Sequence, residues 1–217
     1  MRRRILTDLA NNPDLISGIY NYCDRWCERC PLTSRCLVYA TEQEDNDLLE
    51  SNDARNEAFW KTLGVIFLET RELIARWASV EASAEHKTLT KAGKQYANDA
   101  SDWFREFDQT IEISESGMLE EAREVVQWYQ YQIAVKTMRA LSGREKELAD
   151  ECDGSAKVAL IGVERSIAAW RMMQLSLPER EESIVPLILQ LERLRLRLEK
   201  KFPQARAFIR PGFDEPG

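Results

Sequence analysis

The chain has 217 residues, of which 44% are hydrophobic and 31% charged, and its formal net charge is −7. This composition is typical of a globular protein and long enough for one full-sized domain with a small appendage. The negative charge disfavours nucleic acid as a partner, because phosphate binding needs clustered Lys and Arg. No apolar run reaches the roughly 18 residues that a bilayer span needs. Asp8, Asn11 and Asn12 lie where a signal peptide would be apolar, so we expect a cytoplasmic protein.

The first predicted element is a short helix over 14–22, because Asn12 and Pro13 form a typical helix start. This helix would deliver the chain to a cysteine-rich segment. Pro31 interrupts the backbone within that segment, and a second short helix is predicted over 36–39.

Downstream of residue 53, apolar residues recur at i, i+3 and i+4 over long stretches, which predicts amphipathic helices. Each predicted boundary has a local signal. Gly143 is placed as a C-terminal cap, Asp153-Gly154 as a break, and Ser176 with Glu179 as a capping box, while Pro186 is expected to kink or restart the last helix. The predicted helices cover about 53–77, 90–108, 117–141, 155–175 and 176–202.

Strand signals are nearly absent, because no period-two alternation is sustained along the chain. We therefore predict an all-α fold, an antiparallel bundle of four to five helices with a small N-terminal four-cysteine metal module. The predicted organisation is a cysteine-rich module over 1–40, an acidic connector over 41–52, a helical bundle over 53–202 and a C-terminal tail over 203–217.

Four of the five cysteines lie close together, with the spacing C-x3-C-x2-C-x5-C. In a reducing cytosol such cysteines are expected to be thiols or metal ligands, not disulfides. Four soft thiolates within such a short stretch are enough to enclose one metal centre. The predicted metal and cofactor ligands are Cys23, Cys27, Cys30 and Cys36.

Two identities for this centre stay open. A [4Fe–4S] iron–sulfur cluster is favoured by closely spaced cysteines with a proline directly after one of them. Zinc is the alternative, because Cys27-x2-Cys30 is an ordinary zinc half-site, although a second such half-site is missing. Four cysteine ligands close the coordination of either centre, so the expected role is redox or structural.

The leading functional hypothesis is therefore a cytoplasmic helical metalloprotein with an iron–sulfur cluster. The alternative is a zinc-stapled helical interaction module without catalytic activity, which would bind a protein partner or a second copy of the chain. No phosphate-binding loop or nucleophile motif points to a particular enzyme class.

Two further features are interpreted as structural. Cys152 lies between acidic residues and is expected to be inert. The pair Glu121-x-x-Glu124 is not expected to form a di-iron site, because His86, the one histidine, is predicted to lie between helices.

Lys157, Glu164 and Arg171 recur at seven-residue spacing and form a polar stripe beside an apolar one. The preceding helix carries a run of aromatic and amide side chains over 128–132. These features are interpreted either as surface residues or as the walls of a polar cleft for an anionic or aromatic ligand.

Overall fold

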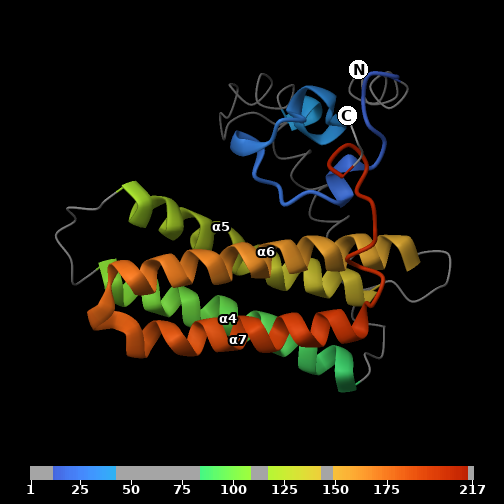
Figure 1. The fold of residues 1–217 in the computed structure, drawn as a ribbon. Helices are drawn as coiled ribbons and strands as arrows, with labels where there is room; N and C mark the ends of the chain where they lie inside the picture. The colour runs from blue at the N-terminus through green and yellow to red at the C-terminus, as the bar shows by residue number, and fades with distance from the viewer. Residues whose placement is uncertain (1–11, 43–83, 109–116, 143–148, 215–217) are drawn as a thin grey trace, which may run out of the picture. The chain divides into compact units, whose positions relative to one another are not determined.

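Figure 1 shows the computed structural model, which describes residues 12–42, 84–108, 117–142 and 149–214. The described residues belong to two compact units. The smaller unit contains residues 12–20 and 27–42, and the larger unit contains Asn21–Trp26 together with the described residues from Ala84 onward. Across the described residues helices predominate and no strand occurs, which confirms the predicted all-α class.

The larger unit is built on four long helices. Each packs against two neighbours, in the ring α4–α5–α6–α7–α4. Consecutive helices run in opposite directions, as the colour gradient in Figure 1 shows. The arrangement is an up-down-up-down four-helix bundle. The bounds are Ala84–Asp108 for α4, Gly117–Ser142 for α5, Ala149–Ser176 for α6 and Glu181–Lys201 for α7.

Aromatic side chains from α4 and α6 form the centre of the bundle core. Trp170 is fully buried, meets the ring of Trp103 edge-on at 5.0 Å and stacks on Phe104. Its indole N–H donates a hydrogen bond to the Tyr96 hydroxyl at 3.0 Å. The Trp103 indole N–H donates to the Ser183 hydroxyl on α7 at 2.9 Å. The core thus satisfies both indole groups while burying large apolar surfaces.

Two of the predicted helix starts are wrong. The helix predicted over 90–108 begins at Ala84, so that His86 lies inside α4 and not between helices. The helix predicted over 155–175 begins at Ala149 and continues through Asp153-Gly154 without a break. Gly154 is buried, and its missing side chain makes room for the rings of Tyr22 and Phe208. Tertiary packing therefore outweighs the local tendency of glycine to end a helix.

The junction after α6 also differs from the prediction. Ser176 is the last residue of α6, and the short 3₁₀ helix η5 (Pro178–Arg180) precedes α7. Neither η5 nor α7 starts with a side-chain cap, so the predicted capping box does not form. Pro186 lies inside α7 without restarting it, exposed in the second turn, where it removes a single backbone hydrogen bond.

The start of the described chain is less helical than the sequence predicts. The Asn12 side chain does accept the N–H of Asp14 at 2.9 Å, as expected of a cap. However, Gly18 has a φ of 70°, a left-handed conformation that ends a right-handed helix. The predicted helix over 14–22 is therefore wrong, and turns with the 3₁₀ helix η1 (Ile19–Asn21) take its place.

The rest of the smaller unit consists of short helical pieces. These are η2 (Cys27–Arg29), η3 (Thr33–Arg35) and a helix over 37–42, which corresponds to the second short helix predicted from the sequence. The helix predicted over 53–77, most of the acidic connector and Gly143 lie outside the described residues. The predicted domain boundaries stay predictions. Among the described helices, none combines the length and apolarity of a membrane span.

Candidate metal centre

All five cysteines lie in the described part of the chain, and none is joined in a disulfide. Cys23 belongs to the larger unit, whereas Cys27, Cys30 and Cys36 belong to the smaller one. These four side chains are half-buried, while Cys152 is buried within α6. The four clustered cysteines are thus less enclosed than Cys152, which packs as a small apolar residue.

The backbone around Cys30 forms a tight turn. The Cys30 N–H donates to the Cys27 carbonyl at 3.2 Å. Two residues beyond, the Leu32 N–H donates to the Cys30 sulfur at 3.4 Å. These two bonds fix the position of the Cys30 side chain within the turn.

The residue before Cys36 is tied to the start of the smaller unit. The Arg35 carbonyl accepts the Ile16 N–H at 3.0 Å, and the Arg35 guanidinium donates to the Asp14 carbonyl at 3.2 Å. The Cys36 N–H itself donates to the Thr33 carbonyl at 3.2 Å. These bonds hold the turn from which Cys36 projects.

In the described residues, no three His, Cys, Asp or Glu side chains form a group that could hold a metal ion. The predicted ligand set of Cys23, Cys27, Cys30 and Cys36 thus rests on the spacing of the cysteines and on their local surroundings. Glu121 and Glu124 are exposed on α5, as expected of surface residues.

Cys23 lies in the segment Asn21–Trp26, which packs on the helical bundle and is called the docked segment below. The Trp128 indole N–H donates to the Asp24 carbonyl at 3.1 Å. The Trp26 ring stacks on Trp128 with 5.1 Å between centroids and meets the Tyr129 ring edge-on. The aromatic run on α5 is therefore a docking surface for the chain that carries Cys23.

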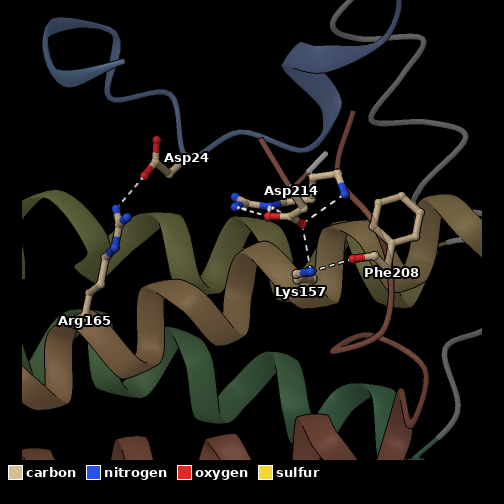
Figure 2. A network of polar contacts seen from close by, with 6 residues as sticks. Asp24, Lys157, Arg165, Phe208 and Asp214 are labelled. Carbon is tan, nitrogen blue, oxygen red and sulfur yellow. Dashed lines mark hydrogen bonds and ion pairs between the residues drawn. The ribbon is translucent and has the colours of Figure 1, made fainter. Parts of the chain in front are cut away.

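The Asp24 carboxylate joins the docked segment to both α5 and α6. It accepts a short hydrogen bond from the Tyr129 hydroxyl and an ion-pair contact from Arg165 at 3.1 Å, which Figure 2 shows rising from α6. Arg165 also donates to the Tyr129 hydroxyl and lies over its ring. Burial, together with the neighbouring Asp24 charge, raises the pKa of Tyr129, so this hydroxyl stays protonated and donates.

Two cations on α5 hold the other end of the docked segment. The buried Lys136 donates to the Asn21 carbonyl at 3.2 Å, and Arg139 donates to the Asn21 side-chain oxygen at 2.7 Å. Burial lowers the pKa of Lys136 to about 8, a shift that the nearby Cys23 thiolate opposes. Burial raises the pKa of Cys23, while the Arg25 N–H and the Lys136 charge oppose that rise. The burial effect is the larger one, so without a bound metal the protonated thiol is favoured at Cys23.

The polar stripe on α6 is an anchoring surface. Lys157 pairs with Asp214 at 2.8 Å, Glu164 with Arg206 at 2.5 Å and Arg171 with Glu192 at 3.2 Å. The first two partners come from the segment after α7 and the third from α7 itself. The stripe thus binds the chain's own charged side chains, which removes the reason to interpret it as the wall of a ligand cleft.

Several residues of this region carried no usable sequence signal. Asp24 and Tyr129 are separated by 105 positions, and Asp24 and Arg165 by 141. The run of aromatic and amide side chains over 128–132 is visible in the sequence, but by itself it predicts surface residues or the wall of a polar cleft, not a docking surface. Comparison of the chain with protein-family models, curated proteins and solved structures found no match to any of them.

Proposed function

We propose that this protein is a cytoplasmic helical metalloprotein in which Cys23, Cys27, Cys30 and Cys36 bind an iron–sulfur cluster of the [4Fe–4S] type. The observation that carries the proposal is the close spacing of four half-buried cysteines, none of them in a disulfide. Four thiolates close the coordination of the cluster, so its role would be electron transfer, redox sensing or bracing of the fold.

The surroundings of the cysteines support the proposal electrostatically. A cluster with four cysteine ligands carries net negative charge, and hydrogen bonds to its sulfurs stabilise that charge. The Leu32 N–H donates to the Cys30 sulfur, and the charge of Lys136 opposes the rise in the Cys23 pKa that burial causes. These are the kinds of groups that surround metal-bound thiolates.

A zinc-stapled interaction module is the second candidate, and the packing of the smaller unit favours it. Of the described residues in that unit, only Ile19 is buried. Small modules without an apolar core are commonly held together by a closed zinc site. In this case the helical bundle would bind a protein partner or a second copy of the chain.

Anaerobic purification followed by metal and sulfide analysis separates the two candidates. An iron–sulfur protein is brown, absorbs broadly near about 400 nm and contains about four iron and four sulfide per chain. A colourless protein with about one zinc per chain favours the structural staple. A purified protein that contains neither metal, and takes up neither on reconstitution, contradicts both candidates.

A further inference from the structure

Gly154, in the first half of α6, marks an unusually close approach between the helix and two aromatic rings. A Cβ atom at this position would lie 2.4 Å from the Tyr22 ring and 2.8 Å from the Phe208 ring. Such distances are too short for non-bonded carbon atoms, so no larger residue fits without a shift. Glycine is less favourable than alanine inside a helix. The contact of the two rings with α6 is the compensating gain.

The ring of Phe208 belongs to residues 202–214, which follow α7 and are called the C-terminal segment. Figure 2 shows Lys157 reaching from α6 to this segment, where it donates to the Phe208 carbonyl at 2.5 Å and pairs with Asp214 at 2.8 Å. Asp214 also pairs with Arg210 at 2.8 Å. The side chains of Lys157, Asp214 and Arg210 are only 18%, 21% and 17% exposed. Water therefore screens these pairs less than it screens surface ion pairs.

The C-terminal segment also contacts Tyr22, the residue directly before Cys23. The Phe208 ring lies against the Tyr22 ring, with 4.9 Å between centroids. Tyr22 is thus held between the glycine surface of α6 and the Phe208 ring. Consecutive Cα atoms are about 3.8 Å apart across a trans peptide, so a fixed Tyr22 restricts where Cys23 can lie.

We propose that the C-terminal segment is a clasp that positions the Cys23 thiol. Lys157 fixes Phe208, Phe208 holds Tyr22 against Gly154, and Tyr22 restrains Cys23 from its N-terminal side. Asp24, bound by α5 and α6, restrains Cys23 from the other side. This proposal depends on the proposed function only for the metal that the Cys23 thiol would bind. The position of the thiol itself can be measured without metal.

The test compares Phe208→Ala and Gly154→Ala with the native full-length chain, each reduced and freed of metal by a chelator. Iodoacetamide labelling followed by mass spectrometry of the peptides gives a separate rate for each cysteine. We expect both substitutions to speed the labelling of Cys23 by about fivefold to tenfold, because the local structure opens more often. Far-UV circular dichroism and cooperative thermal unfolding verify that the bundle stays folded.

Arg171→Ala is the matched control, because it removes an ion pair of the same α6 stripe two heptads away from Lys157. It should leave the Cys23 labelling rate unchanged. Native Cys23 rates in folded Phe208→Ala and Gly154→Ala proteins would overturn the clasp. If either variant does not fold, Asp214→Asn, which weakens the Lys157 and Arg210 contacts without removing a ring, supplies the deciding rate.

A second measurement tests the connection to the metal centre. The metal-loaded native and variant proteins are mixed with excess chelator, and the loss of metal is followed with time. Faster loss from the two clasp variants supports the positioning of a metal ligand. Equal loss, with faster Cys23 labelling, would overturn that connection. A native protein that binds no metal contradicts the proposed function, and the labelling rates then decide the clasp by themselves.

Discussion

The two units of this chain differ in what stabilises them. The larger unit buries aromatic and aliphatic side chains from all four helices, with Trp170 and Leu191 among those fully enclosed. In the smaller unit, Ile19 is the one buried side chain among the described residues. Apolar burial stabilises folding by roughly 25 cal/mol per Å². That term explains the helical bundle but does not explain the cysteine-bearing turns.

Backbone hydrogen bonds are a small stabilising contribution among residues 12–20 and 27–42 of the smaller unit. Bonds such as Ile16 N–H to the Arg35 carbonyl contribute about 1 kcal/mol each. Ordering the backbone costs about 1–2 kcal/mol per residue. A metal bound at the proposed centre would add a further source of stability to the described turns of this unit.

The largest effect is expected from the ligands of that centre. Replacing Cys23, Cys27, Cys30 or Cys36 by Ser should strip the metal and abolish amide-exchange protection over 27–42. Structural metal sites contribute about 10–16 kcal/mol in small modules. The helices of the larger unit should keep their protection, which would separate the two units experimentally.

Cys152→Ser is the control for the ligand substitutions, since it makes the same chemical change at a buried position on α6. It should leave the metal content unchanged. Loss of metal in Cys152→Ser, combined with full retention in Cys36→Ser, would show that the ligand set is wrong.

The next largest effect is expected from substitutions in the bundle core, which should destabilise the larger unit. Trp170→Ala should destabilise the larger unit by about 3–5 kcal/mol, because it leaves a cavity and removes the hydrogen bond to Tyr96. Urea unfolding followed by circular dichroism measures this change. Leu175→Ala on the same helix, 80% exposed, should cost under about 0.5 kcal/mol. A similar loss in both variants would contradict a core centred on Trp170.

A smaller effect is expected where the docked segment meets the bundle. Tyr129→Phe removes the hydroxyl that donates to Asp24 and accepts from Arg165, which should cost about 1–3 kcal/mol. Amide exchange over residues 21–26 should accelerate, while the bundle core keeps its protection. Tyr131→Phe, on the exposed side of the same helix, is the matched control and should change neither. If amide exchange over residues 21–26 is as slow in Tyr129→Phe as in Tyr131→Phe, the Tyr129 hydroxyl does not stabilise the docked segment.

The smallest effect concerns the pH dependence of the C-terminal segment. Hydrogen bonds from Arg210, and then from Lys157, hold the pKa of Asp214 well below its usual range. A depressed pKa in the folded state stabilises the protein above the unfolded value of about 3.9 and loses this contribution as the pH falls below it. We expect the segment to lose about 2 kcal/mol of stability as the pH falls from about 5 to about 2.

Amide exchange or proteolysis of residues 202–214 across that pH range measures the loosening. Asp214→Asn should loosen the segment already at neutral pH and remove its acid dependence. Asp102→Asn, in an exposed ion pair with Arg105, should leave the profile unaltered. An acid transition that persists in Asp214→Asn would assign the pH dependence to another group.

Much of the fold was predictable because long amphipathic helices carry their own periodicity. The helix predicted over 117–141 is α5 to within one residue, and Leu187, Leu191, Leu194 and Leu198 of the last predicted helix are all buried on α7. These positions recur every three to four residues, so a single stripe faces the core. The cysteine cluster was equally visible, since it depends on residue type and spacing alone.

The local signals that failed did so because contacts distant in sequence outweigh them. Asp153-Gly154 has the composition of a helix break, yet α6 continues through it because Tyr22 and Phe208 fill the space over the glycine. Ser176 and Glu179 have capping-box spacing, yet Ser176 is the last residue of α6. The local preference of a glycine or a serine contributes about 1 kcal/mol, and the free energy of packing readily exceeds that contribution.

By itself, therefore, the sequence determined the helical class of this protein, the core-facing stripe of its last helix and the cysteines proposed to bind metal. Only the tertiary structure decided that Trp128, Lys136 and Arg165 bind the docked segment and that the C-terminal segment contacts Tyr22. Periodicity and spacing are local properties that a linear chain displays directly. Contacts across more than a hundred residues arise only when the helices pack, because packing sets which side chains become neighbours.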